Sequence, residues 1–164
     1  MRTSRRNDSG EFSKFITSYA DVSNWPLYPF GYGLSYTTFE YGPITLSNDK
    51  LPITNDNSVT ASVTVTNTGL VPGTEVVQLY IGDRVAKAVR PYKELRGFQR
   101  ITLQPGESKQ VSFDIDADLL GYYAPMSNDQ RLTTNYQWTL EPGEIEIHIG
   151  RNARETQMQL LNVQ

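Results

Sequence analysis

Two glutamates near the end of the chain, Glu144 and Glu146, are the first candidates for chemistry, because glycosidic bond hydrolysis needs a pair of carboxyl groups. They lie in the alternating stretch EIEIHIG, so a strand would place both on one face, about 7 Å apart. A flat strand face offers no pocket that desolvates one carboxyl group and raises its pKa. We therefore expect a solvated face without a catalytic role, and we expect His148, the single histidine, to be exposed on that face as well.

The run DIDAD, from Asp114 to Asp118, places three carboxylates at alternate positions and is superficially similar to a calcium-binding loop. The calcium pattern requires glycine at its sixth position, where this chain has Leu119, and a glutamate at its twelfth, which is absent. The favoured interpretation is an outward strand face that leads into a short helix capped by Asp116 or Asp118.

Other chemistries lack their essential residue types. The chain has no cysteine, and its one histidine provides neither a metal-binding pair nor a positioned base for a serine nucleophile. The GYG at residues 31–33 is not flanked by the strand and helix of a phosphate-binding loop. We expect no catalytic residue, no metal site and no cofactor.

Chain length and net charge limit which classes of function and partner remain. The 164 residues fit one domain, and a net charge of −3 with scattered lysines and arginines does not favour nucleic acid as a partner. The start, MRTSRRND, is not followed by the apolar run of a signal peptide, and no stretch is long enough to cross a membrane. For the chain as written, we expect a cytoplasmic location and no membrane partner.

The elements that must carry any site are strands. Strict alternation in SVTASVTVT predicts a half-buried strand from residue 58, and similar runs follow, with turns that contain Pro72, Pro105 and Pro142. The run at 93–103 changes phase, which makes Gly97 a plausible β-bulge. With a first strand near TTFEYGPITLS, about seven strands predict an all-β, immunoglobulin-like or fibronectin type III-like antiparallel β-sandwich. Residues 124–135 are expected to form a long surface loop.

One segment fits neither a strand nor a helix. WPLYPFGYGLSYTTFEYG, residues 25–42, combines aromatic side chains with glycine and proline, and exposed apolar area of this kind marks a contact surface. Interleaved leucine and proline favour a protein interface over a platform for stacking sugars. The interface or sugar-stacking candidates are Trp25, Tyr28, Phe30, Tyr32, Tyr36, Phe39 and Tyr41.

Several motifs in order resemble a known family. PLYPFGYGLSYTTFEY, VTVTNTGLVPGTEVVQLYI, RPYKELRGFQRITLQPGESKQVSFDI and LEPGEIEIHIG are similar to the C-terminal end of bacterial glycoside hydrolase family three enzymes, the β-glucosidase and β-xylosidase group. The resemblance covers about residues 25–151. It implies the fibronectin type III-like last domain, whereas the catalytic aspartate and glutamate of that family belong to a barrel and an α/β domain upstream. The parent family is often periplasmic or secreted.

The resemblance implies three parts: an unmatched and flexible segment at 1–24, an aromatic docking segment at 25–42 and a sandwich at 43–164. The first hypothesis is a non-catalytic accessory domain that packs against the catalytic domains of the parent hydrolase, or against a second copy of itself. The second is a stand-alone carbohydrate-binding module that binds a β-linked oligosaccharide. The third, and least favoured, is a small glycoside hydrolase with a site at a subunit interface.

Overall fold

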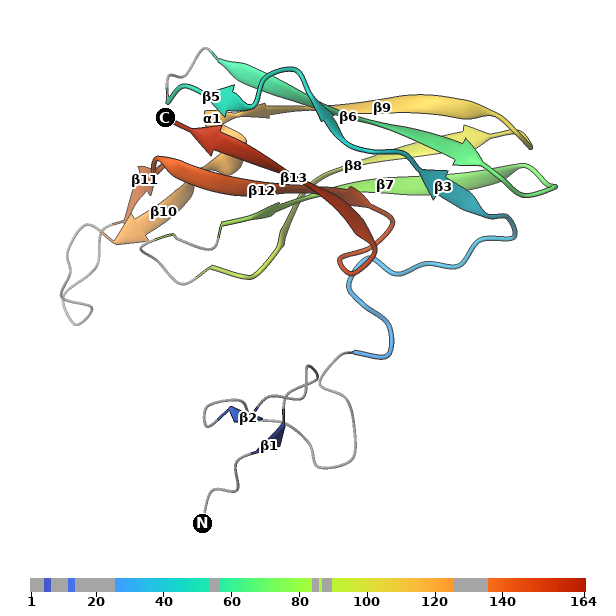
Figure 1. The fold of residues 1–164 in the computed structure, drawn as a ribbon, viewed down its shortest axis with the longest axis horizontal. Coiled ribbons are helices and arrows are strands. Elements are labelled where there is room, and N and C mark those ends of the chain that lie inside the picture. Colours follow the sequence, from blue (N-terminus) through green and yellow to red (C-terminus); the bar gives the residue numbers. More distant parts are fainter. Residues whose placement is uncertain are drawn as a thin grey trace.

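The computed structural model describes residues 5–6, 12–13, 26–53, 57–83, 86, 90–125 and 136–164, and these are almost all in strands and the turns between them. Two sheets face one another in Figure 1, with β6 and β9 in the upper layer and β7, β8, β12 and β13 in the lower one. This confirms the predicted all-β sandwich. Among the described residues, no helix has the length and apolar character needed to span a membrane.

The upper sheet is organised around one long strand. Strand β6 (Ser58–Asn67) pairs along nearly its whole length with β9 (Ser108–Asp116), and on its other edge with the short strands β3 (Phe39–Tyr41) and β4 (Thr45–Leu46). The predicted first strand is therefore divided in two. The break falls at Gly42 and Pro43, because proline has no N–H to contribute to the ladder.

The lower sheet has five strands in the order β5-β13-β12-β7-β8. All neighbours are antiparallel except β5 and β13. Their bounds are Lys50–Leu51 for β5, Gly73–Gly82 for β7, Glu94–Leu103 for β8, Gly143–Gly150 for β12 and Thr156–Val163 for β13. The β7–β8 register shifts so that Leu79 faces Gly97 while Tyr80 faces Leu95, which confirms the predicted bulge.

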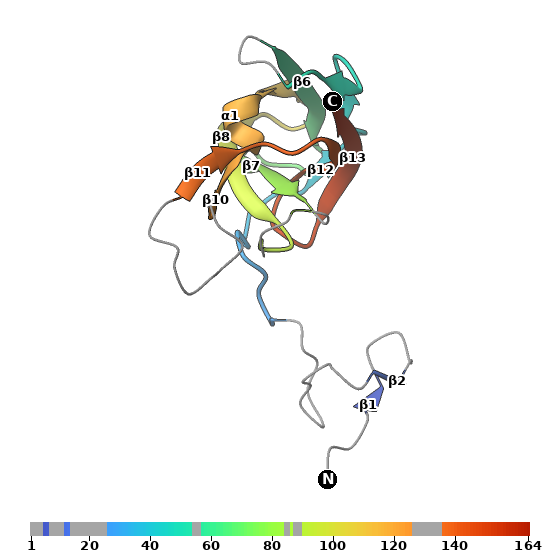
Figure 2. The same ribbon diagram turned by 90° about the vertical axis from the view of Figure 1, so that its left-hand side faces the viewer.

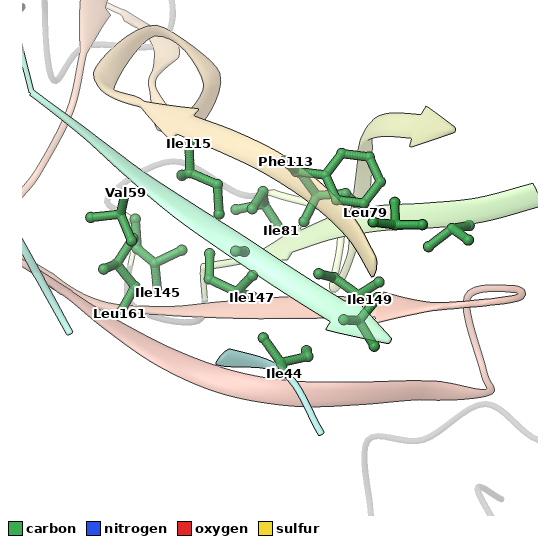
Figure 3. Close-up of a cluster of buried hydrophobic side chains, with 14 of the residues drawn as sticks. Ile44, Val59, Leu79, Ile81, Phe113, Ile115, Ile145, Ile147, Ile149 and Leu161 are labelled. Atoms are coloured by element: carbon green, nitrogen blue, oxygen red, sulfur yellow. The ribbon is translucent and has the colours of Figure 1, made fainter. Parts of the chain in front are cut away.

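The core lies between the two sheets, where the alternation places it. Val59, Ala61 and Val63 of β6 face inward, as do Ile145, Ile147 and Ile149 of β12, and all six are buried. Figure 3 shows these isoleucines beneath β6, together with Leu79, Ile81 and Leu161 from the same lower sheet. Burial of this apolar cluster is the main force that holds the sheets together.

Short elements close one end of the sandwich, the end that faces the viewer in Figure 2. Helix α1 (Ala117–Leu120) begins at Asp116, whose side chain accepts a hydrogen bond of 2.8 Å from the Leu119 amide, as the capping prediction required. Strands β10 (Tyr122–Pro125) and β11 (Tyr136–Thr139) then pair with each other. The predicted loop thus gives Ala124 and Pro125 to a strand, while its residues 126–135 lie outside the described residues.

Near the start of the chain, β1 (Arg5–Arg6) and β2 (Phe12–Ser13) pair with each other. The rest of residues 1–24, and Trp25 as well, lie outside the described residues, so the predictions made for them stay predictions.

Candidate interface: the aromatic segment

The lower sheet is buried on its outer face as well as its inner one. The outward side chains of Gln78, Tyr80, Glu146 and His148 are all nearly inaccessible, with exposed fractions of 8% or less. The prediction that Glu146 and His148 are solvated was wrong; only Glu144 is exposed. Strand periodicity gives the direction of a side chain but not what lies above it, and here segments distant in the sequence cover the face.

One cover comes from the chain before β8. The Lys93 ammonium donates to Thr156 Oγ1 at 2.9 Å, and Thr156 Oγ1 in turn lies 3.3 Å from Nδ1 of His148. On its other side the His148 ring is 3.1 Å from a carboxylate oxygen of Glu146. Glu146, one of the two glutamates that the sequence offers for catalysis, is therefore held in a buried polar network and is not presented to a substrate.

The other cover is the aromatic segment itself, which crosses below the lower sheet as the light blue chain in Figure 1. The Phe30 carbonyl oxygen accepts from the Ala153 amide at 2.9 Å and from the Tyr80 hydroxyl at 3.4 Å. The Gln78 side-chain amide donates to the Gly31 carbonyl at 3.0 Å. Main-chain contacts at residues 30 and 31 thus fix the segment on the sheet.

The β12–β13 turn, residues 151–155, forms the seat for this attachment. Asn152 is buried, and its side-chain oxygen accepts from the Arg154 and Glu155 amides at 3.0 and 2.8 Å. The turn offers its Arg151 carbonyl to Gln78 at 2.6 Å and its Ala153 amide to Phe30. A side chain that locks its own backbone in this way keeps the seat rigid.

Farther along, the segment is anchored again where it enters the upper sheet. The Arg151 guanidinium donates to the Phe39 carbonyl at 2.7 Å, and Thr37 donates to the side-chain oxygen of Asn67 at 2.7 Å. Asn67 is fully buried and also donates to the carbonyls of Val71 and Leu103. The aromatic segment is therefore ordered at both ends of its described part.

The predicted contact residues separate into two groups. Tyr28, Phe30, Tyr32 and Tyr36 are exposed, with Tyr36 as open as in an extended chain (102%). Phe39 and Tyr41 belong to β3: Phe39 packs into the core, and the half-buried Tyr41 donates a hydrogen bond of 2.8 Å to Glu75. Leu27 and Leu34, at 86% and 90% exposed, join the open group; they are not aromatic, so the density of rings in the sequence does not mark them.

The exposed rings do not form one flat platform. Tyr28 and Tyr32 have centroids 4.9 Å apart with their planes tilted by 40°, and Phe30 meets Tyr80 edge-on at 6.5 Å. A sugar ring stacks best on a flat, open aromatic face. This geometry favours packing into an irregular apolar interface over a sugar platform.

A groove of about 500 Å³ runs between the segment and the first half of strand β7, next to the β12–β13 turn. Its lining includes Tyr32 and Leu34 on one side and Glu75 and Arg151 on the other. Burial raises the pKa of the Glu75 carboxyl above its usual value, while the Tyr41 hydrogen bond and the Arg151 charge act in the opposite direction. Burial and the nearby Glu75 charge likewise raise the pKa of the Tyr41 hydroxyl.

The charged side chains that line the groove already have partners within the protein. Glu75 accepts the hydrogen bond from Tyr41, and Glu155 lies 3.9 Å from Arg151. Within the described part of the chain, no group of three or more histidine, aspartate or glutamate side chains is placed to hold a metal ion. Asp114 and Asp116 are engaged with Thr60 and the α1 amide, as the strand-and-cap interpretation of DIDAD expected.

Comparison with known proteins identifies the type of domain. Residues 75–153 match the model of the fibronectin type III-like domain. This chain contains a fibronectin type III-like (Fn3-like) domain. The Fn3-like domain and its flanks are 44% identical over 150 residues to the periplasmic β-glucosidase of Salmonella typhimurium, and 43% identical over 145 residues to a putative β-xylosidase of Formosa agariphila. Other relatives carry the family-three label in their names.

The solved structures that superpose on this chain include β-glucosidases as well. The β-glucosidase EmGH1 of Erythrobacter marinus superposes with a TM-score of 0.80 at 34% identity, covering 97% of this chain and 19% of its own. A β-glucosidase of Listeria innocua in complex with gluconolactone gives a TM-score of 0.79 at 30% identity, covering 99% and 21%. The two sequence relatives are covered over 92% and 87% of this chain but only 18% of their own length. The chain therefore corresponds to the Fn3-like region of family-three glycosidases, about a fifth of each protein.

Proposed function

We propose that the chain is a non-catalytic accessory domain that packs against the catalytic domains of a family-three glycosidase through its aromatic segment. One observation carries the proposal: six large apolar side chains of residues 27–36 are exposed on a backbone that is pinned to the sandwich at residues 30, 31 and 37. An exposed apolar patch on an ordered scaffold is the mark of a preformed contact surface.

The groove adds the polar part of the same surface. Interfaces combine an apolar centre with aromatic side chains and a polar rim. Here the exposed rings adjoin Glu75, Arg151 and Glu155, which together present both carboxylate and guanidinium groups. The partner surface is expected to supply apolar pockets for the rings and hydrogen-bond donors for the two carboxylates.

The test uses the Salmonella relative with its matching region deleted, to which this chain is added as a separate polypeptide. We expect the chain to co-purify with the truncated enzyme and to raise its hydrolysis of an aryl β-glucoside. The variant Tyr28→Ala/Phe30→Ala should lose this binding, because it removes two exposed rings without touching the core. Tyr136→Ala, which removes an equally exposed ring from the β10–β11 hairpin, is the matched control. Equal binding of wild type and the double variant would refute the proposal.

On its own, the purified chain should fold but should not hydrolyse aryl β-glucosides. Turnover that survives rigorous removal of host enzymes and depends on Glu144 or Glu146 would instead support the hydrolase alternative. The free chain is also expected to self-associate through the exposed rings. Sedimentation at high concentration measures this, and a strictly monomeric profile would contradict it.

A further inference from the structure

A second recess lies at the end of the sandwich that β10 and β11 close. In Figure 1 this hairpin is at the opposite end of the molecule from β3, where the aromatic segment enters the upper sheet. The recess, here called the hairpin pocket, has a volume of about 530 Å³. Its lining consists of Arg96, Asp118, Gly121, Tyr122, Tyr123 and Trp138.

Two aromatic residues share the side of the hairpin that faces the pocket. Tyr123 and Trp138 are direct cross-strand partners, which places both side chains on one face of the two-stranded sheet. Tyr123 is 70% exposed, and Trp138 is half-buried. The indole rests on the backbone of Gly121, where an added Cβ would lie 2.6 Å from the indole nitrogen. Only a residue without a Cβ leaves room for the indole at this place.

The neighbouring residue Tyr122 is held by two contacts, one to its hydroxyl and one to its ring. Its hydroxyl donates to a carboxylate oxygen of Glu141 at 3.0 Å, and the Arg90 guanidinium lies over its ring at 4.9 Å from the centroid. Arg90 is itself buried between Asp83 and Glu94, at 3.3 and 3.2 Å. The pocket thus stands on a rigid base, so little order is lost when a ligand enters.

Two polar side chains of opposite charge complete the lining. The Arg96 guanidinium is oriented by Glu94 at 2.6 Å and by the Gly121 carbonyl at 3.4 Å. Its Nε–H is buried without a hydrogen-bond partner, the one such side-chain nitrogen or oxygen found among the described residues. That nitrogen is closed to a ligand, but the Arg96 side chain as a whole keeps 28% of its surface exposed and lines the pocket, so it can offer a cationic donor there. Asp118, in the first turn of α1, is exposed and supplies a carboxylate acceptor.

The combination of groups selects a class of ligand. Aromatic faces attract the weakly positive C–H face of a saturated ring, and a fixed donor next to an acceptor matches hydroxyl groups, which both accept and donate. A phosphate or another anion is disfavoured, because Arg96 is already paired with Glu94 and Asp118 would repel it. A purely apolar ligand would leave both charged groups desolvated without partners.

We propose that the hairpin pocket binds one pyranose unit of a neutral oligosaccharide. The ring lies against Tyr123 and Trp138, while its hydroxyls accept from Arg96 and donate to Asp118. Because the pocket is open and receives a single sugar unit, the expected dissociation constant is about a millimolar. The inference does not depend on the proposed docking of the aromatic segment, which lies elsewhere on the molecule.

The test exploits the presence of only two tryptophans in the chain. The variant Trp25→Phe leaves Trp138 as the sole tryptophan, so its fluorescence reports on the pocket alone. Titration of this variant with cellotetraose, and separately with laminaritetraose, should give a saturable change with at least one of them. Adding Tyr123→Ala should weaken that binding at least tenfold, and Asp118→Ala, which alters an exposed side chain, should do the same.

Tyr136→Ala is the matched control, because this tyrosine is 63% exposed on the same hairpin but does not line the pocket. It should leave the titration unchanged, and thermal unfolding verifies that each variant folds. The proposal is overturned if no saturable change occurs up to about 10 mM sugar, roughly tenfold above the expected dissociation constant. It is equally overturned if binding survives both pocket variants, or if Tyr28→Ala abolishes it, which would assign the sugar to the aromatic segment.

Discussion

Replacing Gly31 with alanine should detach the aromatic segment while leaving the sandwich folded. Gly31 has a φ of 77°, in the left-handed region that side chains with a Cβ rarely adopt. The new methyl group would also collide with the Gln78 side-chain oxygen and lie 2.6 Å from the Tyr80 hydroxyl. Both side chains are buried, so neither moves aside without breaking its hydrogen bond to the segment.

The size of the effect follows from these contacts. The left-handed backbone costs an alanine roughly 1 kcal/mol. Moving the Gln78 side chain aside breaks the bond that it donates to Gly31 and the bond that it accepts from the Tyr80 hydroxyl, at roughly 1 kcal/mol each. A total near 3 kcal/mol raises the ratio of detached to attached segment by roughly a hundredfold.

Hydrogen exchange of the Ala153 amide measures detachment of the segment directly, because that amide donates to the Phe30 carbonyl at 2.9 Å. Its exchange should accelerate by roughly a hundredfold in Gly31→Ala, while amides of the central strand β6 keep their protection. Gly33→Ala is the control, since a Cβ at residue 33 meets no atom within 4 Å and its φ is not positive. Unchanged exchange at Ala153, or equal acceleration by the two variants, would refute the account of how the segment is held.

Three further predictions concern the scaffold. Ile147→Ala empties a fully buried position and should lower the free energy of unfolding by about 2–5 kcal/mol in denaturant titration, whereas Glu144→Ala should change it by no more than about 0.5 kcal/mol. Burial raises the pKa of the Glu75 carboxyl in the folded protein above its value in the unfolded chain. Ionisation of Glu75 therefore opposes folding, and stability is lost as the pH rises through the folded-state pKa. Glu75→Gln keeps an acceptor for Tyr41 but cannot ionise, so at pH 7 it should unfold at a higher temperature than wild type. The difference should vanish below the ordinary pKa of 4.5. A lower unfolding temperature for Glu75→Gln at pH 7 would contradict this. Asp116→Ala removes the α1 cap and should cost about 1 kcal/mol, measured in the same denaturant assay.

Features encoded by neighbouring residues were predictable from the sequence. Alternation placed Val63 and Ile147 in the core, and Asp116 caps the short helix as its position suggested. The phase change near Gly97 marked the bulge correctly. Each of these depends only on backbone geometry and on the polarity of adjacent side chains.

Features that depend on distant segments were not predictable. The cover over Glu146 and His148 comes from Lys93, Thr156 and the chain before β8, and no local pattern announces it. The hairpin of β10 and β11 was also missed, because its strands are short and flank a polar, turn-rich stretch. A local signal was the adjacent pair Tyr122 and Tyr123: both line the pocket, and the Tyr122 hydroxyl also bonds to Glu141 of the scaffold.

The attachment of Phe30 to the β12–β13 turn has a consequence for how the chain is made. During synthesis the aromatic segment is made well before its partners Arg151 and Ala153, which come later in the chain. Until then the rings of Tyr28, Phe30 and Tyr32 have no seat and resemble the apolar segments that chaperones bind. The aromatic segment can therefore take its place on the sheet only after the β12–β13 turn has been made, and until that point the growing chain carries it unattached.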